Sequence, residues 1–288
     1  MENRTIWTIV IVLVVLALLA CCCIGLLVPA AFTTFRTTAG VTEFRVMPGV
    51  TTVRGTGQIV ERAFPLGDVN RVHLTGSADV TIQLGTEASI QIQAEENIID
   101  LVEWEERNRS VVIGMRPNVR IIRDHPIRVT VTVPELVAIT SAGSGDIVAP
   151  DMMSDTINIH VMGSGDVNVD YVEAQTVEIN LNGSGDISLL GVDAEQIQVR
   201  IMGSGWVRPG DGTVNAQDIT ISGSGSYQAE SLESARVSAN LMGSGSARVR
   251  VSDELSARLA GSGNLEYIGS PSIDSTVLGS GRLRQVGQ

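Results

Sequence analysis

A Gly-Ser-Gly-Asp segment occurs three times in the chain at exact intervals of 20 residues, starting at Gly143, Gly163 and Gly183. Three kinds of chemistry could use such a segment. Its carboxylates could bind a hard cation such as Ca²⁺, its backbone amides could hold a phosphate, and its serine could act as a nucleophile. Each possibility makes a demand on the surrounding sequence.

Calcium would use the three carboxylates together. If the copies stack, Asp146, Asp166 and Asp186 lie about 5 Å apart, and a cation would relieve their repulsion. However, only three of eight Gly-Ser-Gly copies keep the aspartate. The later copies have other residues there: Trp206, Ser226, Ser246, Asn264 and Arg282. We therefore favour aspartates that are solvated or accept hydrogen bonds from local backbone N–H groups. They remain the candidate metal ligands, and we expect no other cofactor.

Phosphate binding and nucleophilic catalysis would each need further residues that the sequence does not provide near Gly-Ser-Gly. No Lys follows Gly-Ser-Gly as it does in a P-loop. A nucleophilic serine needs a base, and the chain has only three histidines, His73, His125 and His160. None lies in a nucleophile-elbow pattern, and we expect all three at the surface. The sequence therefore predicts no catalytic residue and no enzyme.

The repeat itself predicts the fold. Gly-Ser-Gly occurs eight times, with spacings of 20 residues that shorten to 18 for the last two, which is typical of a solenoid. Before each copy, apolar and polar residues alternate, as in Ile157, Asn158, Ile159, His160 and Val161. This period of two indicates a strand with one buried face. We expect each unit to consist of a strand, a Gly-Ser-Gly corner, a second strand and a looser turn.

Stacking would bury the apolar faces that single units leave exposed. We predict an all-β fold, a single-stranded right-handed parallel β-helix with coils of about 20 residues. Residues 138–288 would form eight regular coils, roughly 40 Å long, and residues 58–137 irregular N-terminal coils. Glycine would supply positive φ and close backbone approach at the corners. The corner serines would form a ladder of hydroxyl hydrogen bonds.

The N-terminal residues 1–32 look like a membrane anchor. Ile6–Val28 is a run of 23 residues without a charge, long enough to cross a hydrocarbon core of about 30 Å. A cleaved signal peptide is the alternative, but its apolar region is usually shorter, so we favour a retained single-pass anchor. Residues 33–57 are rich in Thr and Gly and are predicted to be a stalk.

Charge limits the partners. The net charge is −12, and residues 138–240 carry 3 Arg against 14 acidic residues, which argues against nucleic acid. Six arginines between Arg107 and Arg128 follow an acidic run from Glu95 to Glu106. They could meet anionic lipid or cell-wall polymer, but we favour mutual pairing within a hairpin.

The order of segments resembles a known family. Gly76-Ser77-Ala78-Asp79 comes first, then "IQAEENIIDLVEWEERNRSVVIGM", a Val-Pro-Glu-Leu strand, and the Gly-Ser-Gly-Asp coils. Over residues 57–288 this order resembles the bacterial head GIN domain family, named putative autotransporter adhesin. The resemblance implies a β-helix on the cell envelope, outside the cytoplasm. It supplies no catalytic residues.

We therefore expect a non-enzymatic, membrane-anchored envelope protein that binds a protein or glycan, or a second copy through the ends of the β-helix. Recognition would use the outward positions of the strands that precede the corners. These form two predicted rows, Asn158, Glu178, Gln198 and Asp218, and His160, Asn180, Arg200 and Thr220. The alternatives are a lyase-like enzyme acting on polysaccharide, or an assembly or sensing module.

Overall fold

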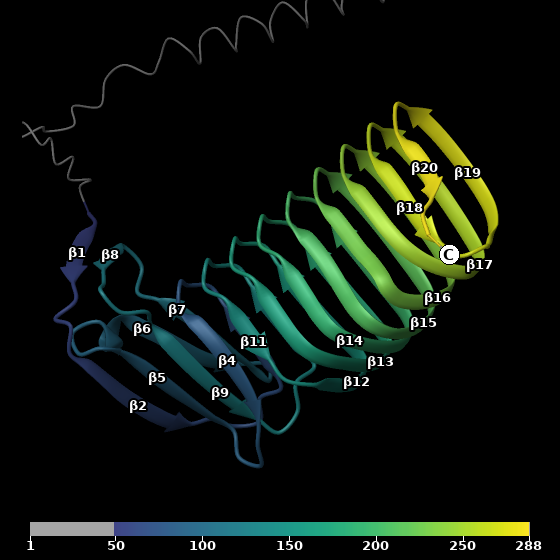
Figure 1. The fold of residues 1–288 in the computed structure, drawn as a ribbon. Helices are drawn as coiled ribbons and strands as arrows, with labels where there is room; N and C mark the ends of the chain where they lie inside the picture. Colours follow the sequence, from purple (N-terminus) through teal and green to yellow (C-terminus); the bar gives the residue numbers. More distant parts are fainter. Residues whose placement is uncertain (1–48, 288) are drawn as a thin grey trace, which may run out of the picture. The chain divides into compact units, whose positions relative to one another are not determined.

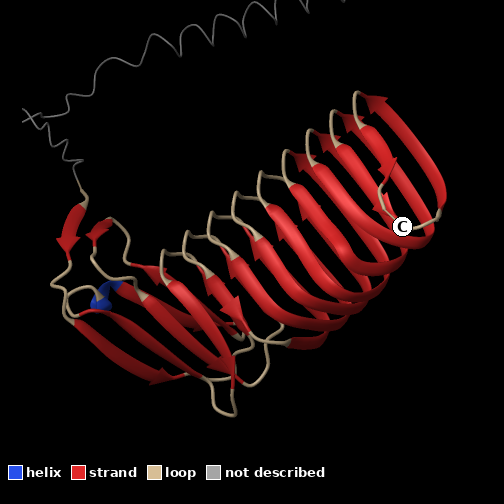
Figure 2. Cartoon of the chain, viewed as in Figure 1, coloured by secondary structure: helices blue, strands red, loops and turns tan. Residues whose placement is uncertain are grey.

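The computed structural model describes residues 49–287, which form an all-β solenoid of about seven turns (Figure 1). Within this range the one helical element is the short 3₁₀ helix η1 (Ile99–Leu101), and strands make up most of the rest (Figure 2). The prediction of an all-β solenoid is therefore confirmed for these residues. We expected eight coils, but eight corners enclose only seven complete turns. The predicted anchor Ile6–Val28 and most of the stalk lie outside the described residues.

The irregular N-terminal part contains nine strands. They are β1 (Thr51–Arg54), β2 (Ile59–Pro65), β3 (Arg71–Leu74), β4 (Asp79–Leu84), β5 (Ser89–Glu95), β6 (Val102–Arg107), β7 (Ser110–Met115), β8 (Val119–Ile122) and β9 (Arg128–Val133). No helix among residues 49–287 is long and apolar enough to cross a membrane.

The regular part contains the remaining strands. They are β10 (Ala138–Ser141), β11 (Ile147–Ala149), β12 (Met152–Val161), β13 (Val167–Leu181), β14 (Ile187–Ile201), β15 (Trp206–Gly223), β16 (Ser226–Gly243), β17 (Ser246–Gly261), β18 (Asn264–Ile268), β19 (Ser272–Gly279) and β20 (Arg282–Gln285). All pairings between these strands are parallel.

The strands β13–β17 each run from one corner to the next as one long curved strand, without the expected looser turn, whereas β11 and β12, and β18 and β19, are separated by a turn as predicted. β13 runs through 15 residues, from one corner to the next. It bends where the alternation of buried and outward residues slips, as at Asp170 and Tyr171, which both face outward between buried Val169 and Val172. Pairing with the next coil resumes directly at Tyr171, because a strand in register with both neighbours can spread a bend over several residues.

The core is a stack of aliphatic side chains. Ile159, Ile179, Val199 and Ile219 come from four successive coils in exact 20-residue register, and each is at most 2% exposed. Burying one such side chain contributes about 1.5–3 kcal/mol. A few polar residues are also buried; one of them, Gln217, accepts a hydrogen bond from the Tyr227 hydroxyl at 2.8 Å. The apolar periodicity therefore identified the buried face correctly.

The N-terminal part joins the solenoid through its first coil. β3 pairs in parallel with β10 on one side and with β7 on the other, and the Ser144 amide donates to the Gly76 carbonyl at 3.1 Å. The segment around Gly76 is thus a corner, as its sequence predicted. Beyond it the sheet becomes antiparallel, with β5 between β2 and β9. β6 and β7 form the predicted hairpin, with Asn108 at φ 54°.

The coil length changes at one place, between β16 and β17. Their register shifts between Ala229 and Glu233, and again between Ser234 and Arg236. The partner offset is 20 residues before these shifts, as in Ala229 with Val249, and 18 after them, as in Arg236 with Glu254. The two missing residues are therefore lost away from the Gly-Ser-Gly corner, and the corners stay stacked.

Candidate functional site

The corner aspartates act as hydrogen-bond acceptors between coils. At four successive corners, the backbone N–H of the residue after Gly-Ser-Gly donates to Oδ1 of the aspartate one coil earlier. The distances are 3.4 Å from Asp146 N to Asp79, 2.9 Å from Asp166 N to Asp146, 2.9 Å from Asp186 N to Asp166, and 2.8 Å from Trp206 N to Asp186. We call this series the Asp ladder. Among residues 49–287, no three or more His, Cys, Asp or Glu side chains are grouped to hold a metal.

The aspartate is lost one corner before the corner changes shape. Trp206 replaces it after Gly203, whereas from Gly223 onward the first glycine of each corner has positive φ, between 125° and 146°. In these later corners the strand continues to that glycine and resumes three residues later, at Ser226 in the first case. The Ser226 amide then donates to the Gly205 carbonyl at 3.1 Å instead of to a carboxylate. A backbone carbonyl thus replaces the carboxylate as the acceptor for this amide.

Close backbone approach explains the glycines of the Asp-containing corners. A Cβ built on Gly163 would lie 1.8 Å from the Gly143 carbonyl oxygen, and one on Gly183 would lie 1.9 Å from the Gly163 oxygen. Such separations exclude any side chain. Positive φ, which we expected at all corners, is restricted to the later ones.

The corner serines do not form the expected ladder of hydroxyl bonds. Their side chains are exposed, and their backbone amides make the contacts between coils, as in Ser164 N to Gly143 O at 3.0 Å. Across the part of the chain that the structure describes, no hydrogen bond joins two corner hydroxyls. The serine points away from the coil axis, while the glycines on either side make the close contacts.

The two predicted outward rows lie next to each other on β12–β15. The structure pairs Asn158 with Glu178, and Gln198 with Asp218. The second row has the same register: His160, Asn180, Arg200 and Thr220. All eight side chains are at least partly exposed. The sequence thus placed these residues together correctly, and their part in binding is a proposal.

All three histidines are at least partly exposed. His125 is exposed, and His160 is half-buried, with Nε2 3.3 Å from the Asn182 amide nitrogen. His73 is also half-buried, and its Nε2 atom is enclosed without a hydrogen-bond partner. Burial lowers the pKa of His73, and the positive charges of Arg107 and His160 lower it further. The register connects the row of His160 to His73 through Thr140.

Two of the six arginines between Arg107 and Arg128 form salt bridges with nearby acidic groups. Arg109 lies 3.0 Å from Asp68, and Arg116 lies 3.0 Å from Glu103. Arg123 donates to the Ser77 carbonyl at 3.1 Å. The predicted pairing within the hairpin is therefore found for Arg116 and Glu103, while Arg109 and Arg123 contact other segments.

Sequence reasoning missed a buried carboxylate in the same part of the chain. The Glu95 side chain is fully buried and accepts hydrogen bonds from the amides of Gly57 (2.6 Å), Asp124 (2.9 Å) and His125 (3.2 Å). These bonds, that of Gly57 first, hold the pKa of Glu95 below its usual value against the opposing effect of burial. Only the fold brings the three amides to this residue.

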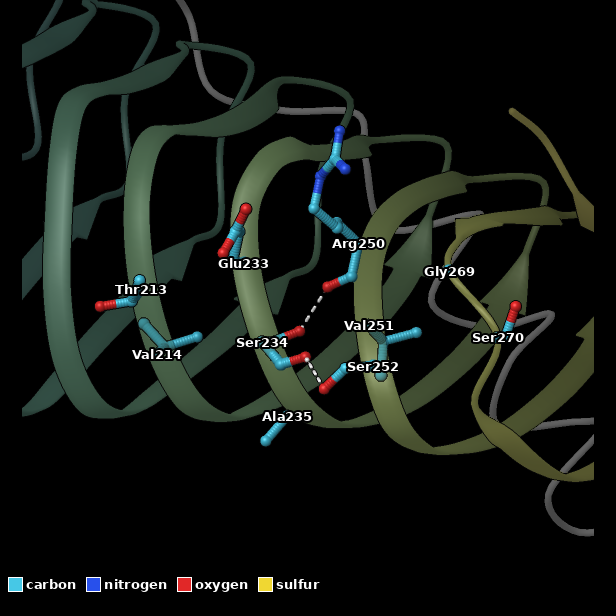
Figure 3. Close-up of a pocket in the computed structure, with 10 residues that line it drawn as sticks. All are labelled: Thr213, Val214, Glu233, Ser234, Ala235, Arg250, Val251, Ser252, Gly269 and Ser270. Atoms are coloured by element: carbon cyan, nitrogen blue, oxygen red, sulfur yellow. Dashed lines mark hydrogen bonds between the residues drawn. The ribbon is translucent and has the colours of Figure 1, made fainter. Parts of the chain in front are cut away.

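A pocket of about 520 Å³ opens where the coil length changes (Figure 3). Its lining comes from four coils: Thr213, Val214, Glu233, Ser234, Ala235, Arg250, Val251, Ser252, Gly269 and Ser270. The Ser234 hydroxyl donates to the Arg250 carbonyl at 2.5 Å, and the Ser252 hydroxyl lies 3.4 Å from the Ser234 carbonyl (Figure 3). Two of the lining hydroxyls therefore contact backbone carbonyls of the neighbouring coil beside the register shift. The signal in the sequence was the change in period.

Comparisons with known proteins agree with this architecture. The family described as "Putative auto-transporter adhesin, head GIN domain" matches residues 68–192 and 172–271. None of the curated proteins matches the chain.

Several solved structures share the fold. A putative adhesin from Parabacteroides distasonis has a TM-score of 0.75 at 21% identity, covering 82% of this chain and all of its own. A putative adhesin from Parabacteroides merdae has a TM-score of 0.75 at 21% identity, covering 83% of this chain and all of its own. A putative lipid binding protein from Parabacteroides distasonis has a TM-score of 0.76 at 23% identity, covering 82% of this chain and all of its own. At these identities the likeness shows the fold alone.

Proposed function

Because the chain belongs to the family described as putative auto-transporter adhesin with a head GIN domain, we propose that it is a non-enzymatic envelope protein that displays its solenoid for binding. The partner would be a protein or a glycan outside the cytoplasm. Ile6–Val28 would hold the protein in the membrane as a single span, with residues 49–287 on the outer side.

The observation that carries this proposal is the regularity of the outward rows. Over β12–β15 the register is an exact 20-residue translation, so each outward position recurs once per coil. Coils about 4.8 Å apart therefore present polar side chains at a constant spacing. A flat surface with a constant repeat suits an extended partner that makes many similar contacts.

The lyase-like alternative has less support. It would use the corner aspartates as calcium ligands beside an arginine base. In the structure, Asp146, Asp166 and Asp186 each use Oδ1 for a backbone amide of the next coil. A binding role for the outward rows needs no change in these bonds.

The test replaces the outward rows and measures binding by the full-length protein. One variant carries Glu178→Ala, Gln198→Ala and Asp218→Ala, and a second carries Asn180→Ala, Arg200→Ala and Thr220→Ala. The control carries Glu173→Ala and Glu195→Ala, two exposed residues on another face of β13 and β14. Partners are screened on a glycan array and on a panel of purified extracellular proteins.

We expect the row variants to lose a partner that the unchanged protein and the control both bind, while their thermal unfolding stays close to that of the unchanged protein. Equal binding by all variants would contradict the proposal for these rows.

A further inference from the structure

A second line of outward side chains crosses the C-terminal coils on the strand segments that follow the corners. It contains Arg208, Gln228, Arg248, Glu266 and Arg284, one residue from each successive coil, and we call it the basic row. The register pairs Gln228 with Arg248, Arg248 with Glu266, and Glu266 with Arg284. Side-chain hydrogen bonds place Arg208 next to Gln228. Arginines thus alternate with acceptors along the solenoid.

Each arginine of the basic row is held by the acceptor beside it. Arg208 donates Nε and Nη2 to Gln228 Oε1 at 3.1 and 2.6 Å. Arg248 donates the same two nitrogens to Glu266 Oε2 at 2.9 and 2.5 Å, and Arg284 donates Nη2 to the other oxygen of Glu266. Holding a guanidinium in place before binding reduces the entropy that a ligand must offset.

The guanidinium groups remain accessible. The side chains of Arg248 and Arg284 are 48% and 67% exposed, whereas that of Glu266 is only 20% exposed. Glu266 therefore lies beneath the two cations. Its pKa is lowered by the hydrogen bonds from Arg248 and Arg284, so it stays ionised and keeps both arginines in position.

The basic row stands out in an acidic protein. Its three arginines exceed its one carboxylate, although the net charge of the chain is −12. Arg282 is exposed on the adjacent row of the last coil, and beyond Glu266 the carboxylate of Glu230 also acts on the charge of Arg248. The Asp ladder lies on earlier coils, so the surface after the corners changes from acidic to basic along the solenoid.

The row beside the arginines carries side chains that suit a sugar. Trp206, Ser226, Ser246 and Asn264 occupy successive coils there. The Trp206 ring stacks on the Arg208 guanidinium, 4.5 Å from its centroid. Hydroxyl and amide groups can exchange hydrogen bonds with sugar hydroxyls, and an indole offers a flat apolar face.

Other occupants fit this surface less well. β15, β16 and β17 each pair with a strand on both sides, so no edge is free there to add a peptide strand. Recognition must therefore use side chains alone, on a surface that repeats.

We propose that the basic row binds an extended carboxylated glycan, a polymer of uronic acids. Arg208, Arg248 and Arg284 are separated by two coils each, roughly 10 Å, which suits a chain whose carboxylates recur regularly. Each guanidinium can form paired hydrogen bonds with a ligand carboxylate through its Nη1 and Nη2 edge, since Arg208 and Arg248 direct their Nε and Nη2 edge at Gln228 and Glu266. This names a partner class for the proposed binding function but uses other residues, so either proposal can fail alone.

The test measures binding of polygalacturonate to the full-length protein by isothermal titration calorimetry. The test variant carries Arg208→Gln, Arg248→Gln and Arg284→Gln. The matched control carries Arg120→Gln, Arg236→Gln and Arg258→Gln, which removes three exposed arginines from outside the basic row. A third variant, with lysine at the three row positions, keeps the charge but loses paired recognition. Thermal unfolding checks that each variant is folded.

We expect affinity to fall roughly 30-fold in the glutamine variant of the row, about threefold for each exposed arginine removed. The lysine variant should bind with intermediate affinity, and the control should bind like the unchanged protein. Binding should also weaken as salt increases. If the glutamine variant does not fold, the affinity of the lysine variant for polygalacturonate is the test. An affinity equal to that of the unchanged protein would overturn the proposed paired recognition by arginine.

Other polymers identify the ligand class. Dextran is neutral, dextran sulfate carries sulfate groups, and single-stranded DNA carries phosphates. Binding of dextran as tightly as polygalacturonate, or binding of dextran sulfate or DNA alone, would overturn the proposal. The variants of the outward rows should keep polygalacturonate binding. Loss of this binding in those variants alone would show that the polymer binds the outward rows on β12–β15 and not the basic row.

Discussion

At the residue scale, the corner aspartates show how one side chain joins neighbouring coils. The Asp166 carboxylate accepts from the Asp186 amide at 2.9 Å, and the Asp166 amide donates to Asp146 at the same distance. A part-buried amide that loses its acceptor costs more than the bond itself contributes. The carboxylates therefore stabilise the stack despite carrying like charges on successive coils.

Replacing Asp166 separates hydrogen bonding from charge. Asp166→Ala should lower the free energy of unfolding by about 1 kcal/mol, because the Asp186 amide loses its acceptor. Asp166→Asn keeps an acceptor oxygen and removes a repelling charge, so it should stay within about 0.5 kcal/mol of the unchanged protein. Urea titration measures both. If the two variants lose equal stability, the carboxylate charge is what matters.

The buried Glu95 should make the protein sensitive to acid. Hydrogen bonds in the folded state lower its pKa below the unfolded value of about 4.3. The ionised group therefore contributes stability at neutral pH, and this contribution is lost as pH falls below about 4.3 toward the folded pKa. In Glu95→Gln, stability at pH 7 should be lower, and the loss between pH 5 and 3 should be shallower.

Urea midpoints measured across this pH range check the prediction for Glu95. The matched control is Glu173→Gln, at an exposed position on β13, which should keep the pH dependence of the unchanged protein. An equally steep acid loss in Glu95→Gln would show that other groups cause it.

At the element scale, the corners set how closely the coils stack. The first glycine of each corner lies against the carbonyl of the equivalent glycine one coil earlier, and the serine beside it faces solvent. Gly-Ser-Gly looks like one motif, but its residues have different roles. The glycines are required because the backbones of neighbouring coils approach closely at the corner. The serine is tolerated because its side chain is exposed to solvent.

Gly183→Ala and Ser184→Ala test this division within one corner. A Cβ at Gly183 would lie 1.9 Å from the Gly163 carbonyl oxygen, so the coils must separate locally and stability should fall by about 2 kcal/mol or more. Ser184→Ala should change stability by less than about 0.5 kcal/mol. Thermal and urea unfolding provide the measurement, and a large effect of Ser184→Ala would restore a role for the hydroxyl ladder.

At the scale of the whole molecule, the regular part is a translation of one unit. From β12 to β15 every paired residue is offset by exactly 20 positions. In such an array each coil contacts only its neighbours, and stability is close to a sum over coils and their interfaces. One coil can then be removed without changing the environment of the others.

Deleting residues 183–202, exactly one coil, should leave a folded protein with one fewer coil and a smaller urea m-value, since less surface is exposed on unfolding. The control deletes residues 183–201. Its one-residue difference moves the side chains that follow to the opposite face, so it should not fold. Circular dichroism and urea titration distinguish the two, and a folded control would argue against fixed register.

The sequence by itself determined the buried face, the 20-residue repeat and the position of the corners, because the alternation along a strand is a local property. It also placed the outward rows, since residues one repeat apart must become neighbours. Only the tertiary structure decided what the polar groups do. The acceptor role of Asp166, the amides around Glu95, the enclosed Nε2 of His73 and the positions of the arginines in the basic row all depend on contacts between segments far apart in the sequence. Hydrogen bonds require atoms within about 3 Å, a distance that periodicity does not specify.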